Sequence, residues 1–155
     1  VCQAWTGHLV AAAGEGAAAF VTEEDAARTA AVLLTSRERS GEMLEVTGPR
    51  MESYSDIAEA IREFTSQRMS YLRATASAAR GHLISSAGLT EQAADLTVSC
   101  QLAIQAGKYG PPSPVVRDLT GSNPISVREF IQARRRAWAE DRQAFGLPPT
   151  GSRQP

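Results

Sequence analysis

The sequence predicts a mixed α/β fold of α+β character, with a few short strands and four to five helices in one domain. Capping patterns stand in front of apolar residues at helical spacing at several places along the chain. The capping residues are Thr22, Ser53, Thr90 and Ser126. Short apolar runs bounded by glycine or proline lie between these helices and suit strands. With 155 residues, of which 43% are hydrophobic, the chain is long enough to bury a core.

Two extended runs open the chain. Residues 8–13 (HLVAAA) and 17–21 (AAAFV) read as short strands, and a hairpin turn at Gly14 and Gly16 is expected to join them.

The first helix is predicted from Thr22, which precedes Asp25 by three residues and so has the spacing of a capping box. Acidic residues in the first turn suit the helix dipole, and the helix is expected to end near Leu34. The residues expected to form its packing face against a sheet are Ala27, Ala31 and Leu34.

A strand, a helix and another strand follow. The segment EMLEVTG at 42–48 is predicted to be a strand that ends at a Gly-Pro pair. Ser53 and Asp56 repeat the capping pattern. The apolar residues that follow at helical spacing are Ile57, Ala60, Ile61 and Phe64. Residues 68–74 (RMSYLRA) form the next predicted strand.

The second half is predicted to be helical. One short helix covers 77–88, and a longer one begins after the cap Thr90 and ends at Gly107. The residues expected to share a face of the longer helix are Leu96, Cys100 and Ala103. The proline-rich segment 108–114 reads as a loop.

The last predicted helix begins at a capping box formed by Ser126 and Glu129. The residues expected to be buried on it are Val127, Phe130 and Ile131. We expect one domain over residues 1–145 and a disordered tail over 146–155, which is rich in glycine, proline and polar residues.

Charge and cysteine usage narrow the classes of partner. The net charge of −1 gives no field to attract nucleic acid or an anionic membrane, so neither is expected as a partner. No apolar run is long enough to cross a bilayer, and no signal peptide is visible. Cys2 and Cys100 show no pairing pattern, which suits a reducing compartment, and the cytoplasm is the expected location.

Gly14, Gly16 and Ala19 match the spacing of a dinucleotide-binding fingerprint. That motif requires a helix directly after the glycines, because the helix N-terminus binds the pyrophosphate. Here an apolar extended run follows, and the helix cap comes only at Thr22. A turn is therefore the favoured interpretation, and we expect no bound cofactor.

His8 and His82 are the two histidines, and this side chain titrates near neutral pH. A single histidine is more often a hydrogen-bonded structural residue than a functional one. No two of the histidines and cysteines have metal-ligand spacing, so no metal site is expected.

Three segments carry a resemblance to a known family: GEGAAAFVTEEDAARTAAVLL, GEMLEVTGPRMESYSDIAEAI and VRDLTGSNPISVREFI. Together they resemble the C-terminal portion of NmrA-like proteins, the atypical branch of the short-chain dehydrogenase/reductase superfamily. The resemblance runs from about residue 7 to residue 135. Thr22 stands where the family usually has aspartate. The family's nucleotide-binding half, with its glycine loop, has no counterpart in this sequence, so the resemblance implies a substrate lobe that does not hold NAD(P) by itself.

Three functions are compatible with this resemblance. The leading hypothesis is a small-molecule-binding domain that acts on an apolar substrate of natural-product type by cofactor-independent cyclisation or isomerisation. The first alternative is the C-terminal part or a subunit of an NAD(P)-dependent oxidoreductase. The second is a non-catalytic regulator of the same family.

The resemblance also suggests where a substrate would bind, because the family's pocket corresponds to residues 5–9 and roughly 69–100. Within these windows we expect His82 and Tyr71 to act in catalysis. The expected substrate-binding residues are Trp5, His8, Met69 and Leu83.

The same resemblance suggests that the chain associates with a second polypeptide. A lobe without its nucleotide-binding half would expose sheet edge and apolar surface. We expect a homodimer, or a complex with a separate Rossmann half, with Trp5 or Trp138 near the covered surface.

Overall fold

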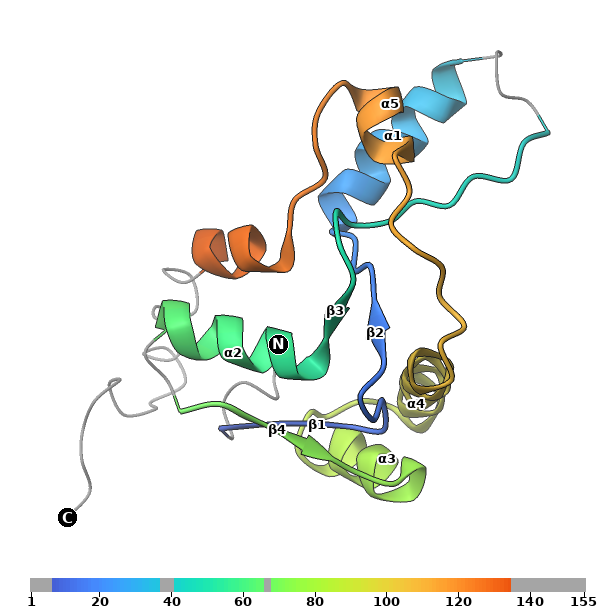
Figure 1. The fold of residues 1–155 in the computed structure, drawn as a ribbon. Helices are drawn as coiled ribbons and strands as arrows, with labels where there is room; N and C mark the ends of the chain where they lie inside the picture. The colour runs from blue at the N-terminus through green and yellow to red at the C-terminus, as the bar shows by residue number, and fades with distance from the viewer. Residues whose placement is uncertain (1–6, 37–40, 66–67, 135–155) are drawn as a thin grey trace.

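The computed structural model describes residues 7–36, 41–65 and 68–134 (Figure 1). Strand β1 (His8–Ala11) runs parallel to β4 (Ser70–Arg73), with His8 opposite Ser70. Strand β2 (Ala17–Ala18) runs antiparallel to β3 (Glu52–Ser53). The sheets in these ranges are therefore two separate two-stranded pairs.

Six helical segments surround the strand pairs within the described ranges. They are α1 (Glu23–Thr35), α2 (Tyr54–Thr65), α3 (Ala76–Ser85), α4 (Glu91–Gln105), α5 (Val115–Thr120) and residues 127–134. Figure 1 shows α1 and α5 together at one end of the molecule, and α3 and α4 beside the β1–β4 pair at the other. The predicted mixed fold with few short strands is confirmed.

The cores are small and rich in alanine. One cluster joins α3 to α4, a second joins α2 to the helix at 127–134, and a third lies where β1 and β2 meet the end of α4. The residue that links α2 to the last helix is Ile131, which packs on Ala58 and Ile61. Val127 and Phe130 are half-buried against the same cluster rather than fully buried.

The predicted capping residues are confirmed by hydrogen bonds. The Thr22 hydroxyl accepts from the Asp25 amide at 3.1 Å, and the Thr90 hydroxyl accepts from the Ala93 amide at 3.3 Å. The Ser126 amide donates to the Glu129 carboxylate at 2.8 Å, which completes a reciprocal capping box. Side chains close in sequence form these caps, so sequence spacing is sufficient to predict them.

The predicted hairpin between residues 8–13 and 17–21 is wrong. The chain does turn at Gly14, where φ is +55° and the conformation is left-handed. However, β1 pairs with β4 and β2 pairs with β3. Gly16 passes so close to the end of α4 that a Cβ there would lie 2.2 Å from the Ile104 carbonyl oxygen. This close approach directs β2 away from β1.

The strand predicted at 42–48 is also wrong. Residues 42–48 have no ladder partner in the part of the chain that the structure describes, and the next paired residue after them is Glu52. Met43 is exposed, and the Thr47 hydroxyl accepts from the Ser113 amide at 2.7 Å. The Gly48 amide donates to the Ala19 carbonyl at 3.0 Å. The segment is therefore fixed by single hydrogen bonds from different directions.

The packing faces predicted for two helices are wrong. In α1 the predicted face is exposed, and Leu34 is 88% exposed, because α1 packs against the short helix α5 and buries Asp25 and Thr29. In α4, Leu96 is 67% exposed and Cys100 is also exposed. The residues that α4 buries are Ala94, Val98, Gln101 and Ile104.

The proline-rich loop ends in a helix that the sequence did not predict. Helix α5 begins directly after Pro114 and ends at Thr120, and its C-cap Gly121 adopts a left-handed conformation with φ of +70°. No helix among the described residues is long and apolar enough to cross a membrane. The expected tail at 146–155 lies outside the described residues, as do Trp5 and Trp138.

Candidate functional site

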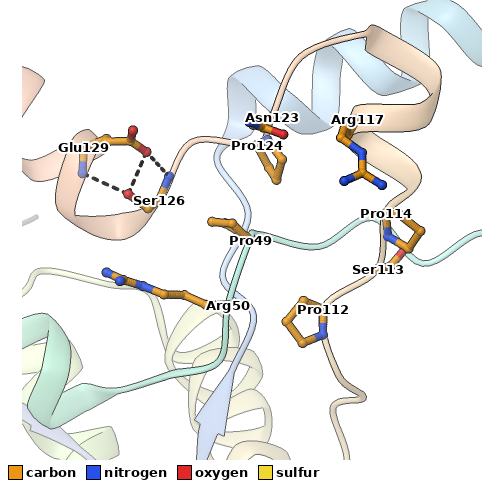
Figure 2. Close-up of a pocket in the computed structure, with 10 residues that line it drawn as sticks. All are labelled: Pro49, Arg50, Pro112, Ser113, Pro114, Arg117, Asn123, Pro124, Ser126 and Glu129. Atoms are coloured by element: carbon orange, nitrogen blue, oxygen red, sulfur yellow. Dashed lines mark hydrogen bonds between the residues drawn. The ribbon is translucent and has the colours of Figure 1, made fainter.

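A groove of about 440 Å³ lies between three loop segments (Figure 2). Its walls come from the turn at 49–50, the segment 112–117 that leads into α5, and the segment 123–129 that leads into the last helix. Four of the lining residues are prolines: Pro49, Pro112, Pro114 and Pro124. We call this cavity the proline groove. No pattern in the sequence predicts this groove, because its walls come from segments that meet only in the fold.

The charged residues of the proline groove differ in how they are paired. The Arg50 guanidinium donates to one oxygen of Glu52 at 3.0 and 2.8 Å, whereas Arg117 contacts Asp118 only at 3.4 Å. Hydrogen bonds from the Ser126 hydroxyl and amide hold the pKa of Glu129 below its usual value. The Glu129 carboxylate is therefore ionised at neutral pH.

Glu52 is a buried carboxylate that is bonded to the lining residue Arg50. Its second oxygen has no hydrogen-bond partner, although the residue is almost fully buried. A buried oxygen without a partner is uncommon and raises the energetic cost of burying the charge. The two hydrogen bonds from Arg50 to the other oxygen offset part of that cost.

Of the predicted site residues, Tyr71 lies in an aromatic cluster that the structure reveals. The Tyr71 ring stacks on Tyr54 with centroids 5.7 Å apart, and Tyr54 meets Phe20 edge to face at 6.1 Å. The Tyr71 hydroxyl donates to the Ala11 carbonyl at 3.4 Å. We call Phe20, Tyr54 and Tyr71 the aromatic cluster. Its members come from three separate segments, so sequence spacing gives no signal for it.

The polar groups of the aromatic cluster are partly removed from water. Burial raises the pKa of the Tyr54 hydroxyl, and the Gln101 side chain offsets this only in part. Burial also raises the pKa of Tyr71. Gln101 is itself buried and accepts from the Ala12 amide at 2.9 Å. Both phenols therefore remain protonated at neutral pH and can act as hydrogen-bond donors.

The two histidines occupy different surroundings. His8 is exposed on β1, and its Nδ1 lies 2.9 Å from the hydroxyl of Ser70, its register partner on β4. His82 lies on α3 and is half-buried, and its Nε2 is buried without a hydrogen-bond partner. An imidazole nitrogen in this state can accept or donate one more hydrogen bond.

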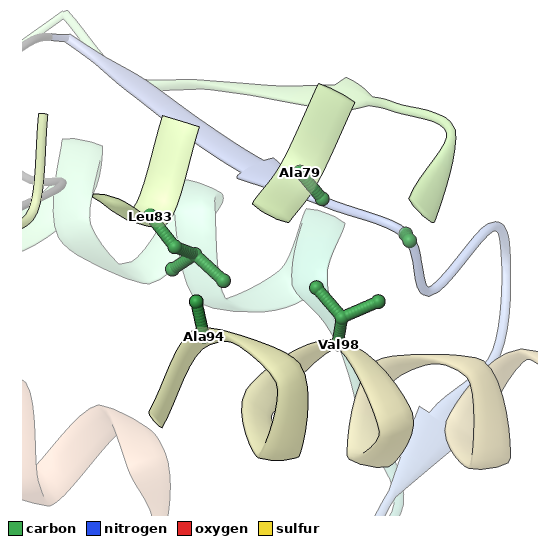
Figure 3. Packing of buried hydrophobic residues seen from close by; sticks show 5 residues of the cluster. Ala79, Leu83, Ala94 and Val98 are labelled. Atoms are coloured by element: carbon green, nitrogen blue, oxygen red, sulfur yellow. The ribbon is translucent and has the colours of Figure 1, made fainter. Parts of the chain in front are cut away.

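Met69 and Leu83 are both core residues in this structure. Met69 packs with Ala60 and Ile61 of α2, whereas Leu83 packs between α3 and α4 with Ala94 and Val98 (Figure 3). They belong to different clusters, so the structure does not bring them together in one wall. Trp5 lies outside the described residues.

No group of three or more histidine, cysteine, aspartate or glutamate side chains within residues 7–36, 41–65 and 68–134 is arranged to hold a metal ion. Among the described residues predicted for the site, those with proton-transfer chemistry are Tyr71, His8 and His82.

Proteins with similar sequences include dehydrogenases and oxidoreductases, each matched over less than half of its length. Agroclavine dehydrogenase of Claviceps fusiformis is 25% identical over 130 residues, covering 84% of this chain and 45% of the relative. An uncharacterized oxidoreductase of Bacillus subtilis is 28% identical over 132 residues, covering 85% and 46%. No family model matches the chain.

The fold is shared with part of an NADPH-dependent quinone oxidoreductase of Escherichia coli. The TM-score is 0.76 at 21% identity, over 83% of this chain and 46% of that protein. The chain thus spans about half the length of the proteins it matches. The relatives thus support the resemblance of this chain to one part of the atypical short-chain dehydrogenase/reductases.

Proposed function

We propose that this chain supplies the substrate-side part of an NAD(P)H-dependent oxidoreductase. The observation that carries the proposal is the match of more than four-fifths of the chain to dehydrogenases and oxidoreductases. These relatives favour the oxidoreductase alternative over cofactor-independent cyclisation or isomerisation. Hydride would come from a nicotinamide bound to a separate nucleotide-binding half, and this chain would orient the acceptor.

The first test reads the coding sequence upstream of Val1. We expect an in-frame segment with a strand, a glycine-rich turn and a helix, which is the arrangement that binds a pyrophosphate. The polypeptide encoded by that reading frame is then assayed for NADPH oxidation, with a quinone as the electron acceptor. Turnover that needs NADPH supports the proposal.

Conversion of a substrate by this chain without any nicotinamide would instead favour the cyclase hypothesis. Ligand binding without turnover would favour the regulator.

Within this function we propose Tyr71 and His82 as the groups that transfer a proton or hydrogen-bond the acceptor. A tyrosine hydroxyl is protonated at neutral pH, so Tyr71 could donate to a developing negative charge in exchange for its long 3.4 Å hydrogen bond to the Ala11 carbonyl. The Nε2 of His82 is buried and has no hydrogen-bond partner among the described residues. His8, Met69, Leu83 and Trp5 remain proposed substrate contacts.

The substitutions Tyr71→Phe and His82→Gln test this assignment separately. We expect each to lower kcat for the acceptor by about 100-fold, the lower range for removing a general acid or base, with a smaller change in KM. Tyr109→Phe is the matched control, because Tyr109 is an exposed tyrosine outside the aromatic cluster. Unchanged kcat in both variants would remove Tyr71 and His82 from the mechanism.

A further inference from the structure

We propose that the proline groove is a binding site for a small aromatic carboxylate, with Arg117 pairing with the carboxylate and proline rings packing against the aromatic ring. The site is separate from the function proposed above, because no lining residue belongs to the aromatic cluster and neither histidine lines it. The proposal therefore stands whether or not the chain takes part in hydride transfer.

The walls of the groove are held in place by contacts between distant segments. The Ser113 amide donates to the Thr47 hydroxyl at 2.7 Å, which joins the segment before α5 to the turn at 49–50. The Ile125 amide donates to Asp25 at 2.8 Å, which fixes the third wall to α1. The groove is thus preformed, and a ligand that enters it loses little affinity to the ordering of loops.

The apolar part of the lining suits a flat ring. Proline rings are rigid and carry no amide hydrogen, so they present apolar surface without a donor that burial would leave unsatisfied. Pro49, Pro114 and Pro124 stand around the same opening in Figure 2. The volume of about 440 Å³ falls within the range of small-molecule sites, roughly 300–1,000 Å³.

The charges of the groove select the ligand's charge and orientation. The Arg117 side chain is 61% exposed and makes only a long contact to Asp118, so its donors are available to a carboxylate. Arg50 is occupied by two shorter contacts to Glu52. The ionised Glu129 lies at another part of the lining and repels a second negative charge. A singly charged carboxylate fits this arrangement better than a dianion.

The test is a titration of the full chain with 2-naphthoate, followed by amide chemical shifts. We expect saturable shifts at Ser113, Arg117 and Asn123, with 2-naphthamide and 2-naphthyl phosphate each binding more weakly. Arg117→Gln should weaken naphthoate binding about fivefold, the size expected when one half-exposed ion pair is lost. Asp118→Asn should tighten it by up to a similar factor, because the competing carboxylate is removed.

The matched control is Arg62→Gln, which removes an exposed arginine on α2 outside the groove. It should leave the affinity for naphthoate unchanged, and near-ultraviolet circular dichroism confirms that each variant is folded. Shifts that map outside the groove, equal binding of the neutral amide, or equal affinity in wild type and Arg117→Gln would each overturn the proposal. Tighter binding of the phosphate than of naphthoate would overturn the assignment of a singly charged ligand.

Discussion

Asp25 links two parts of the chain that are 100 residues apart in the sequence. Its carboxylate is fully buried and accepts hydrogen bonds from the Ile125 amide, the Thr22 hydroxyl and Arg28. Burial by itself raises the pKa of this carboxyl, but the hydrogen bonds together hold the pKa below its usual value. The residue therefore bonds to the N-cap Thr22 of α1 and also positions the segment that forms one wall of the proline groove.

We predict that Asp25→Ala lowers the free energy of unfolding by about 2–3 kcal/mol, because it leaves buried donors without their charged acceptor. Urea denaturation monitored by circular dichroism measures the change. Glu24→Ala is the matched control, since Glu24 is an exposed acid in the same helical turn, and it should change the free energy by less than about 0.5 kcal/mol. Equal effects of the two substitutions would mean that Asp25 is only a surface acid near the helix dipole.

Acid sensitivity follows from the carboxyl groups whose pKa values are lowered, among them those of Asp25, Asp56 and Glu129. Amide and hydroxyl hydrogen bonds from Ser53 lower the pKa of Asp56, and those from Ser126 lower the pKa of Glu129, as the partners of Asp25 do for Asp25. A depressed folded-state pKa contributes stability that is present above the unfolded pKa, about 4, and is lost as the pH falls through the folded value.

We therefore predict that the free energy of unfolding is nearly constant between pH 7 and about pH 5 and decreases below about pH 4. Urea denaturation at a series of pH values measures this, and the slope should be smaller in Asp25→Asn than in wild type. A maximum of stability near pH 3 would contradict the assignment.

At the scale of the element, Gly48 and Gly81 differ in how much space an added Cβ would have. A Cβ at Gly48 would lie 1.9 Å from the Phe20 carbonyl oxygen, a backbone atom that cannot rotate away. Gly81 lies within α3, and a Cβ there would meet nothing within 4 Å.

We predict opposite effects for the two alanine substitutions. Gly48→Ala should destabilise the fold by about 1–3 kcal/mol, because the turn behind the proline groove must move. Gly81→Ala should stabilise α3 by about 0.5–1 kcal/mol, because alanine loses less backbone entropy in a helix. Thermal denaturation of both variants measures the difference. Destabilisation by Gly81→Ala would show that α3 is packed more tightly than the structure indicates.

The sequence was sufficient for features that depend on neighbours along the chain. The caps at Thr22, Thr90 and Ser126 are formed by residues three positions apart, so their pattern is complete in the sequence. The buried face of α1 was not predictable, because it is set by α5, a helix about ninety residues later that follows the proline loop and has no side-chain cap.

The same distinction between neighbouring and distant residues applies to the candidate sites. Tyr71 and His82 could be selected from the sequence because tyrosine and histidine carry proton-transfer chemistry. Their partners could not, since Tyr54 and Phe20 reach Tyr71 from other segments. The proline groove had no sequence signal at all, because its walls join three loops through hydrogen bonds such as that between Ser113 and Thr47.

At the scale of the whole molecule, the described residues leave sheet edges and apolar side chains uncovered. Each of the two strand pairs has only two strands, and an isolated pair of this size is marginal in water. Parallel strands such as β1 and β4 are usually covered on both faces. Leu72 on β4 is 45% exposed and Leu96 on α4 is 67% exposed. A further layer is expected to cover these surfaces.

We propose that a second copy of the chain covers these surfaces when no nucleotide-binding half is present. Light scattering after size-exclusion chromatography should then give twice the chain mass at micromolar concentration. Leu72→Arg should shift the chain toward monomer, because it places a charge where apolar contact is expected. Leu34→Arg should leave the mass unchanged, since Leu34 lies on α1, at the end of the molecule away from β4.

A monomeric wild-type chain over the whole concentration range would rule out the homodimer. If an added nucleotide-binding half instead forms a one-to-one complex that Leu72→Arg weakens, the same surface serves the oxidoreductase.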